Sequence, residues 1–351
     1  MMQEVVFTNR IEESIERLCC AEKYDRYFVL CDSNTRKCVL PRIVSNIISQ
    51  AELITIEAGE GAKSLDSLAH VWGELSARGA TRHSLLINVG GGMITDLGGM
   101  AAATFKRGMA FVNIPTTLLG AVDAAVGGKT GINFAGLKNE VGVFAQARMV
   151  VISTRFFDTL SREELLSGYA EMLKHGLIDG EAHYNELLNY DITAFEAETL
   201  LPLLQYSVGI KQRIVEQDPH EKGLRKLLNL GHTIGHAFES HSHKHGRVVA
   251  HGYAVAWGLV CELLIAHRLL SFPSAVIYDL ARFVEKEYGA YAITCDDYDE
   301  LIALMQHDKK NVGEKINFSL MKKIGDLRID NYVERKEIEI SLDFFRDLFH
   351  L

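Results

Sequence analysis

The sequence of 351 residues lacks an excess of basic side chains. Its 37 lysines and arginines are outnumbered by 46 aspartates and glutamates, which gives a formal net charge of −9. Proteins that bind nucleic acid present a basic face to the phosphate backbone, so we expect no nucleic-acid partner. An acidic protein can still bind an anionic small molecule where a few basic side chains converge, and the charge balance does not exclude this.

The sequence also lacks the cysteine spacings of zinc or redox motifs. Its six cysteines are scattered without a C-x-x-C pair, which indicates reduced thiols in a cytoplasmic protein. The N-terminal segment has no basic start followed by an apolar run, so we expect no signal peptide. The longest apolar run, Tyr253 to Ala266, is shorter than a membrane span and contains Glu262. We expect a buried helix there and no membrane partner.

The hydrophobic pattern of the chain changes near residue 161. Before that point, apolar segments typical of buried strands alternate with helical ones, and the expected strands are 27–31, 53–57, 85–89, 111–114 and 149–152. This alternation predicts an α/β fold with a Rossmann-like, doubly wound parallel sheet. The later expected helices are 162–178, 181–190, 196–216, 224–240, 251–270 and 274–288, with a strand at 316–321. We predict two domains, 1–161 (α/β) and 162–351 (mainly helical), with the active site in the cleft between them.

Two glycine-rich segments lie where predicted strands end. Gly90-Gly-Gly92 precedes a helix, and glycines there let the backbone approach a phosphate at the helix N-terminus. The GxGxxG fingerprint fits imperfectly, because Thr95 occupies its third glycine position, and a tight structural turn is the alternative. The segment 115–130 ends in Gly-Gly-Lys-Thr, but Asp123 replaces the first glycine of a P-loop. Lysines among glycines at strand ends still indicate a ligand site.

Histidines and a carboxylate in the second half predict a metal site. His232 and His236 are four residues apart, so they share one face of a helix. His251 opens an apolar helix after a polar loop, and Glu171 shares a helical face with Lys174. Two imidazoles and one carboxylate leave an open position, as in catalytic zinc sites. The alternative is that His232 and His236 line a helix and bind nothing.

Several motifs, in this order, resemble those of the 3-dehydroquinate synthase family. The resemblance covers roughly residues 55 to 325, and the set of motifs is far more specific than any one of them. The motifs are Gly59-Glu-Gly-Ala-Lys63, Gly90-Gly-Gly-x-x-x-Asp96, Arg107-Gly, Pro115-Thr-Thr-Leu-Leu, Val122-Asp-x-x-Val-Gly-Gly-Lys-Thr-Gly-Ile-Asn133, Lys138-Asn139, Ala170-Glu-x-x-Lys174, Glu221-x-Gly-Leu-Arg225, Leu228-Asn-x-Gly-His-Thr-x-Gly-His236, His251-Gly252 and Asp308-Lys-Lys310.

The resemblance implies a homodimeric lyase that uses NAD and zinc, with cobalt as a possible substitute. The implied substrate is 3-deoxy-D-arabino-heptulosonate 7-phosphate, and the products are 3-dehydroquinate and phosphate, a step of the shikimate pathway. The implied steps are transient oxidation by NAD⁺, phosphate elimination, re-reduction, ring opening and intramolecular aldol closure. There is no net redox change.

By motif position, the resemblance implies roles for particular residues. Zinc would bind Glu171, His232 and His251, whereas His236 would face the reacting groups. The implied substrate and catalytic residues are Asp123, Lys129, Asn139, Lys174, Lys211, Glu221, Arg225, Asn229, His236 and Lys309 (or Lys310), with Arg107 reaching across the dimer. The implied cofactor contacts are Glu60, Lys63, Gly91, Gly92, Asp96, Thr116, Thr117, Lys129, Lys138, Phe157 and Thr159.

The sequence departs from the family pattern at a few positions. Ala124-Ala125 replaces the usual Ser-Ser, and two usual prolines are absent, near Ala147 and within 159–163. The 237–250 segment is longer than is common and rich in histidine, and we expect its histidines to lie in a solvated loop. Three rival functions stay open: another sugar phosphate cyclase, a metal-dependent alcohol or glycerol dehydrogenase, and a non-catalytic protein that keeps the fold.

Overall fold

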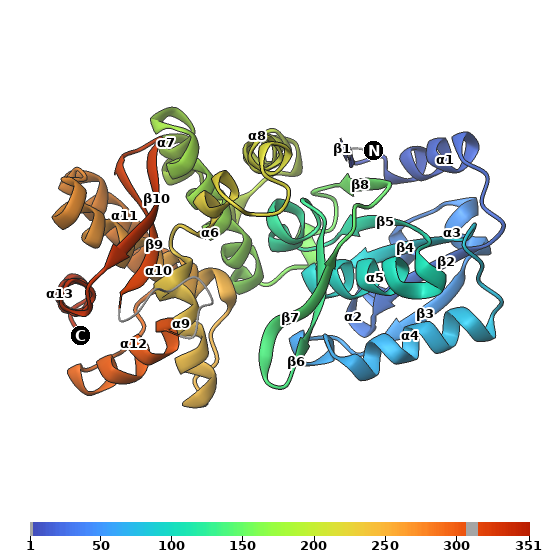
Figure 1. Cartoon of the computed structure of the whole chain (residues 1–351). Helices are drawn as coiled ribbons and strands as arrows, with labels where there is room; N and C mark the ends of the chain where they lie inside the picture. Colours follow the sequence, from blue (N-terminus) through green and yellow to red (C-terminus); the bar gives the residue numbers. More distant parts are fainter. Residues whose placement is uncertain (1–2, 307–314) are drawn as a thin grey trace. The chain divides into compact units, whose positions relative to one another are not determined.

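The computed structural model describes residues 3–306 and 315–351, and the chain divides into two compact units (Figure 1). Unit 1 comprises the chain up to Ser161 together with Phe195–Gln212, and unit 2 comprises Arg162–Ala194 and Arg213–Leu351. The chain first passes from unit 1 to unit 2 after Ser161, at the boundary predicted from the sequence. The segment Phe195–Gln212, however, packs with unit 1, although we expected it in the second domain.

A six-stranded, fully parallel sheet in the order β1-β8-β5-β4-β2-β3 forms the centre of unit 1. This confirms the predicted α/β class. The strands of unit 1 are β1 (Glu4–Phe7), β2 (Tyr27–Asp32), β3 (Glu52–Ile56), β4 (Leu85–Gly90), β5 (Ala110–Pro115) and β8 (Met149–Ile152), with the antiparallel hairpin β6 (Lys129–Phe134) and β7 (Leu137–Phe144). The helices are α1 (Ile11–Ala21), α2 (Ser33–Cys38), α3 (Asn46–Gln50), α4 (Leu65–Ala77), α5 (Gly92–Thr104) and most of α8 (Ala197–Gln217).

The central strand β4 shows why a continuous apolar run forms a parallel strand. All six of its residues are buried, as expected for a strand with both faces covered. The buried Asn88 donates a hydrogen bond from its Nδ2 to the Oδ1 of Asn113 on β5, at 2.9 Å. Gly98 leaves room above this pair, because a Cβ there would lie 2.0 Å from the Oδ1 of Asn88. The small residues of α5 thus allow this helix to lie close to the sheet.

Unit 2 is mainly helical, with one antiparallel strand pair (Figure 1). Its elements are α6 (Arg162–Asp179), α7 (Glu181–Asn189), α9 (His232–Lys244), α10 (His251–Leu270), α11 (Ser274–Tyr288), α12 (Tyr298–Gln306), β9 (Ile316–Lys323), β10 (Asp326–Val333) and α13 (Arg335–Leu348). Strand β10 and helices α12 and α13 were not predicted from the sequence.

The region 224–240, predicted as one helix, is interrupted. A 3₁₀ turn spans Leu224–Asn229, and α9 starts only at His232, because Gly231 adopts a left-handed conformation with a φ of 79°. Helix α9 then continues to Lys244. The prediction that the following histidines lie in a solvated loop is therefore wrong: His241 and His243 are helical, and the side chain of His241 is fully buried.

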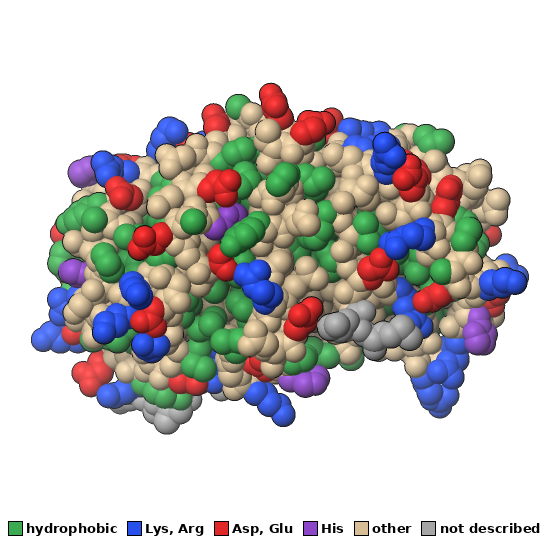
Figure 2. Space-filling model, turned by 90° about the horizontal axis from the view of Figure 1, so that it is seen from above, with side chains coloured by type: hydrophobic (Ala, Val, Ile, Leu, Met, Phe, Trp, Pro, Cys, Tyr) green, Lys and Arg blue, Asp and Glu red, His purple; other side chains and the backbone are tan. Residues whose placement is uncertain are grey.

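Helix α10 is the one helix, among the residues the structure describes, that has the length and apolar composition to cross a membrane. Most of it is buried, and every residue from Ala254 to Ala266 lies in the interior of unit 2. This agrees with the predicted buried helix, because core helices of globular proteins can have the same length and apolar composition as a membrane-spanning helix. On the face shown in Figure 2, acidic and basic side chains are interspersed with apolar ones.

Glycines allow three helices of unit 2 to approach one another closely. A Cβ on Gly258 of α10 would lie 2.0 Å from the backbone oxygen of Gly231, just before α9. A Cβ on Gly252, at the start of α10, would lie 2.0 Å from the backbone oxygen of Ser167 on α6. The N–H of Gly252 also donates to the Oγ of Ser167 at 3.0 Å. The first residues of α9 and α10 are thereby held next to the middle of α6.

The buried carboxyl group of Glu262 caps the start of α9. It accepts hydrogen bonds from the N–H groups of Gly231 (2.6 Å) and Ile234 (3.1 Å). The first N–H groups of a helix lack partners within the helix, and the residue preceding α9 is a glycine with no side chain to supply one. Burial raises the pKa of Glu262 to about 8, against the opposing effect of the N–H donors.

We predict that Gly258→Ala destabilises unit 2, since its methyl group would collide with backbone atoms that cannot move aside. The expected loss is about 1–3 kcal/mol in the free energy of unfolding, measured by urea denaturation. Gly73→Ala in α4 is the matched control, because a Cβ there meets nothing within 4 Å. That variant should be neutral or more stable by up to about 1 kcal/mol. Equal stability of the two variants would contradict the close crossing.

We also predict that Glu262 makes folding depend on pH. Its pKa of about 8 lies above the ordinary value of 4.5, so the folded protein keeps a proton that the unfolded chain releases between these values. The stability that Glu262 confers should fall as pH rises through this window. Urea denaturation of the unmodified chain and of Glu262→Gln, from about pH 5 to about pH 8, isolates this effect as the difference between the two. A difference that does not change with pH would refute it.

Candidate active site

Glu171 lies in the middle of α6 with its side chain fully buried. Its Oε1 is 3.4 Å from the Nε2 of His232 and 3.6 Å from the Nε2 of His251. Two ligands of one tetrahedral zinc ion, each about 2.1 Å from the metal, lie about 3.4 Å apart. The carboxylate oxygen of Glu171 is therefore as far from each imidazole nitrogen as two ligands of one cation are from each other.

Each of the two histidines uses its other ring nitrogen elsewhere. The Nδ1 of His232 lies 3.1 Å from the backbone oxygen of Leu230, and the Nδ1 of His251 lies 3.2 Å from the Oε2 of Glu239. A proton on Nδ1 donates to these acceptors and leaves the lone pair of Nε2 directed at Glu171. Metal-binding histidines are oriented in this way by carbonyl and carboxylate partners.

The charges around Glu171 favour its ionised form. Burial alone would raise its pKa, but the ammonium group of Lys174 and the imidazole of His232 hold the pKa well below its usual range. Lys174, one helical turn along α6, is itself almost fully buried and forms an ion pair with the Oε2 of Glu171. Burial lowers the pKa of His232, which favours the neutral imidazole form that a metal ion binds.

His251 differs from His232 in having a raised pKa, because two carboxylates lie beside its ring. Burial alone would lower its pKa, but the carboxylates of Glu171 and Glu239 beside the ring raise the pKa to about 10. Two carboxylates thus stabilise a positive charge next to this ring. A bound cation can supply that charge in place of the proton.

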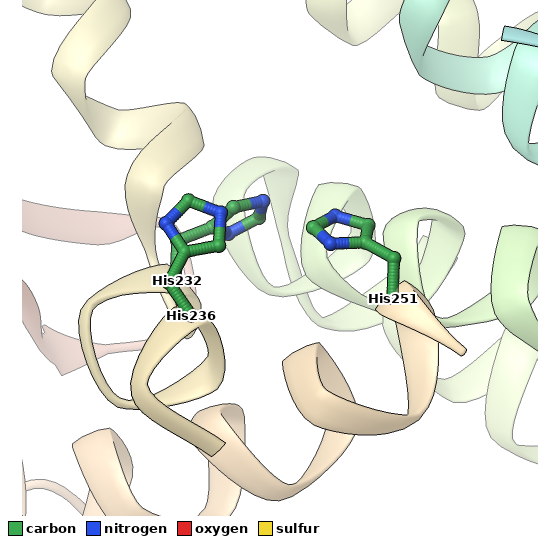
Figure 3. A group of neighbouring side chains, drawn as sticks. All are labelled: His232, His236 and His251. Atoms are coloured by element: carbon green, nitrogen blue, oxygen red, sulfur yellow. The ribbon is translucent and has the colours of Figure 1, made fainter. Parts of the chain in front are cut away.

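His236 is a further candidate ligand on the next turn of α9. Its ring centroid lies 5.2 Å from that of His232 and 5.8 Å from that of His251, and Figure 3 shows the three rings grouped together. One nitrogen from each of the three histidines lies within 4.8 Å of the others. His236 is more exposed than the other two, so the geometry allows it to bind a metal or to face a ligand.

A small pocket of about 60 Å³ lies beside these histidines in unit 2, lined by Lys226, Asn229, His232, Thr233, His236, Asn317, Phe318, Ser319 and Asp330. Asn229 donates from its Nδ2 to the Oε1 of Glu221 at 2.9 Å. Arg225 is buried, and its Nη1 donates to the backbone oxygen of Pro219 at 2.8 Å. The predicted residues Glu221, Arg225, Asn229 and His236 thus lie on one short stretch of chain, whereas Lys309 lies outside the described residues.

A second cluster of predicted residues lies in unit 1. The Nζ of Lys63, which is 4% exposed, donates to the Oδ2 of Asp96 at 2.6 Å and to the Oδ1 of Asn139. Burial raises the pKa of Asp96 to about 6, against the effect of the neighbouring Lys63. Asn133 joins the group, since its Nδ2 donates to the Oε1 of Glu60 at 2.9 Å.

The glycine-rich turn lies at the carboxyl end of the sheet. Gly91 immediately precedes α5, and Thr116 and Thr117 follow the adjacent strand β5. A Cβ on Gly91 would lie 3.0 Å from the side chain of Thr117, so the two strand ends approach closely. Open parallel sheets bind ligands at this edge, and the N-terminus of α5 offers N–H groups there.

The remaining predicted residues of unit 1 occupy several places. Lys211 on α8 donates to the backbone oxygen of Asp123 at 2.6 Å and forms an ion pair with its carboxylate. Lys129 and Lys138 are exposed on the β6–β7 hairpin. Phe157 is fully buried, and Thr159 donates from its Oγ1 to the oxygen of Phe156 at 2.6 Å.

Arg107 lies apart from the cofactor cluster, after the C-terminal end of α5. It lines a cavity of about 490 Å³ together with Glu22, Lys23, Tyr24, Arg82, His83, Gly108, Met109, Ala110, Phe111, Gln146 and Arg148. The structure therefore does not bring Arg107 to the glycine-rich turn of its own chain.

Sequence reasoning missed three residues that hold the separate clusters of the two units in place: Glu239 and Glu262 in unit 2, and Asn133 in unit 1. Glu239 orients His251, Glu262 caps the helix that starts at His232, and Asn133 links Glu60 to the β6–β7 hairpin. The available signal for Glu262 was a carboxylate inside an otherwise apolar helical segment, whereas Glu239 stands among histidines and serines and gave none. Asn133 gave no such signal, because asparagine is common in turns.

Two family models together match most of the chain. Models described as 3-dehydroquinate synthase N-terminal and C-terminal match residues 53–167 and 168–311. A 3-dehydroquinate synthase from Parabacteroides distasonis is 49% identical over 349 residues, which covers 99% of each chain.

Two solved structures resemble the whole chain. One is 2-epi-5-epi-valiolone synthase from Streptomyces hygroscopicus with NAD⁺ and Zn²⁺ bound, at a TM-score of 0.85 and 25% identity, covering 99% of this chain and 97% of that one. The other is 2-deoxy-scyllo-inosose synthase with carbaglucose-6-phosphate, NAD⁺ and Co²⁺, at a TM-score of 0.84 and 23% identity, covering 98% and 96%. With the matches to the family models and to the relative from Parabacteroides distasonis, these findings show that the chain belongs to the 3-dehydroquinate synthase family.

Proposed function

We propose that this chain converts 3-deoxy-D-arabino-heptulosonate 7-phosphate to 3-dehydroquinate and phosphate, in a reaction without net oxidation or reduction. The observation that carries the proposal is the convergence of Glu171, His232 and His251, with Lys174 beside them, in a member of this family. A divalent cation and a buried ammonium group are both suited to a substrate that carries a carboxylate, a phosphate and vicinal hydroxyls.

Glu171, His232 and His251 would hold the metal ion, zinc or cobalt. The bound ion supplies Lewis acidity, which favours loss of the hydroxyl proton before oxidation and polarises a carbonyl in the aldol step. The distances from Glu171 to both Nε2 atoms and the acceptors beside both Nδ1 atoms support this assignment. His236, on the more exposed side of the group, would face the substrate and exchange protons with it.

The basic residues would bind the anionic groups of the substrate. Arg225 can bind a phosphate or carboxylate bidentately, whereas the lysines act as point charges. In this proposal the substrate contacts are Asp123, Lys129, Asn139, Lys174, Lys211, Glu221, Arg225, Asn229 and His236. The expelled phosphate can take up the proton that is lost during elimination, so the chain does not have to supply a strong base.

Unit 1 would bind NAD, which supplies the transient hydride acceptor. Gly91 and Gly92 at the start of α5 would contact the pyrophosphate, since backbone N–H groups are available there. The network of Lys63 with Asp96 and Asn139 would position the rest of the cofactor. Further contacts in this proposal are Glu60, Thr116, Thr117, Lys129, Lys138, Phe157 and Thr159. The reaction requires this cofactor and the metal ligands of unit 2 to act on one substrate molecule.

We further propose that the protein is a cytoplasmic homodimer. Arg107 lies away from the cofactor cluster of its own chain, which suits a role at the site of a second copy. Of the rival functions, another sugar phosphate cyclase would use the same metal and cofactor, so only the substrate distinguishes it. An alcohol or glycerol dehydrogenase would accumulate NADH.

We predict that phosphate is released from 3-deoxy-D-arabino-heptulosonate 7-phosphate in many-fold excess over added NAD⁺, without accumulation of NADH. Phosphate release and absorbance of NADH are followed together, with zinc present and with NAD⁺ omitted as the control. One NADH per substrate without phosphate would identify a dehydrogenase. Neither signal, from protein that binds zinc and NAD⁺, would indicate a cyclase for a different sugar phosphate.

We predict that Glu171→Gln removes one equivalent of zinc per chain and lowers turnover by about 100-fold or more, because a neutral amide is a poor zinc ligand. His236→Ala should keep that zinc and lose turnover. His70→Ala, an exposed histidine on α4, is the matched control and should change neither. Zinc is measured by elemental analysis of the purified variants. Zinc lost from His236→Ala but kept in Glu171→Gln would contradict the assignment.

A further inference from the structure

A second cluster of potential metal ligands lies at the far end of α9. His241 and His245 are one helical turn apart, and their rings stack with centroids 4.1 Å apart. Asp297 and Glu300, from the turn that starts α12 and from α12 itself, face these rings. All four residues belong to unit 2. His232 and His241 are nine residues apart on α9, so the cluster lies roughly 14 Å along the helix from the first metal site.

His241, His245 and Glu300 each offer a ligand atom within 4.8 Å of the others, and Asp297 lies beside His241. The Nε2 of His241 is 3.5 Å from the Oδ1 of Asp297 and 3.8 Å from the Oε2 of Glu300. The Nε2 of His245 is 3.0 Å from the same Oε2 of Glu300. Ligands of a tetrahedral zinc ion are separated by about 3.4 Å. The two distances from His241 are too long for hydrogen bonds but suit a shared ion.

The side chain of His241 is buried, and one of its ring nitrogens, Nε2, faces the two carboxylates without a hydrogen bond to any residue that the structure describes. Its side chain is 0% exposed, and within the described part of the chain its Nε2 has no hydrogen-bond partner. Its Nδ1 lies 2.7 Å from the hydroxyl of Tyr291 and can donate to it. The Nε2 lone pair then points toward two carboxylates. A buried, unpaired nitrogen in this position is unfavourable unless a cation lies between them.

The carboxylates are held by further contacts that leave one oxygen of each directed at the histidines. The Oδ2 of Asp297 accepts hydrogen bonds from the backbone N–H (2.7 Å) and the hydroxyl (3.1 Å) of Thr294. The Oε1 of Glu300 accepts a hydrogen bond from the Nζ of Lys244 at 3.1 Å. Such outer contacts orient the ligands of known metal sites. Lys244 and Arg247 supply positive charge beside the two carboxylates, so the case for a bound cation rests on the spacing of the ligand atoms and on the unpaired Nε2 of His241.

We propose that His241, His245, Asp297 and Glu300 form a second zinc site, separate from the catalytic one. Two imidazoles and two carboxylates suit Zn²⁺ or a similar divalent transition metal. With Asp297 as the fourth ligand beside His241, the protein would close the coordination sphere, which is typical of a structural site and not of a catalytic one. The ion would tie the C-terminal end of α9 to α12, and so fix the helix whose other end carries His232. This inference does not depend on the proposed reaction.

The test compares the zinc content of full-length variants. His245→Ala and Glu300→Gln change partly exposed ligands, so neither variant should fail to fold. The unmodified chain should hold two zinc ions, and each variant one, with turnover unchanged. His243→Ala is the matched control, because this exposed histidine lies between the two ligands and should keep both ions. With Glu171→Gln added, the His245→Ala chain should hold none.

Cobalt provides a second readout. Co²⁺ bound in both sites should give visible absorption that His245→Ala reduces by about half, with at least a 10-fold loss of affinity at the affected site. An unmodified chain that binds one zinc ion, all of it removed by Glu171→Gln, would overturn the proposal. So would a His245→Ala chain that keeps the same zinc content as the unmodified protein. Neither result would bear on phosphate release.

Discussion

A fully buried carboxylate, Glu171, sets the main constraint on unit 2. An ionised carboxylate in the protein interior is costly unless positive charge surrounds it. The chain provides Lys174 on one side and two imidazoles on the other, and their Nε2 atoms lie 3.4 and 3.6 Å from one carboxylate oxygen. A cation bound at this point would contact Glu171 and both imidazoles. The same ion would therefore offset the cost of the buried negative charge and form the metal site.

The packing of three helices follows from this constraint. Ligands on α6, α9 and α10 can converge only if the helices approach to backbone contact, and Gly231, Gly252 and Gly258 allow this. Glu262 then anchors the start of α9 through N–H groups on both sides of His232, and Glu239 orients His251. The other end of α9 carries the proposed second zinc site. Stability, ligand orientation and metal affinity therefore depend on the same helix.

Much of the architecture could be predicted from hydrophobic periodicity, because buried parallel strands and long helices leave strong patterns. The spacing of His232, His236 and His251 likewise indicated candidate ligands. Sequence could not show which nitrogens converge, since that depends on partners such as Glu239. It also placed α8 with the helical domain, whereas Lys211 binds Asp123 of unit 1 across 88 positions. The break at Gly231 and the burial of His241 were missed, because backbone conformation and tertiary packing decide both.

In the proposed metal site, Glu171 and not His236 is the third ligand beside His232 and His251. X-ray diffraction from crystals of the full chain, with data collected on both sides of the zinc absorption edge, tests this most directly. We expect an anomalous peak about 2.1 Å from one carboxylate oxygen of Glu171 and from the Nε2 atoms of His232 and His251. A peak bound by the three histidines, with Glu171 still paired only to Lys174, would contradict it.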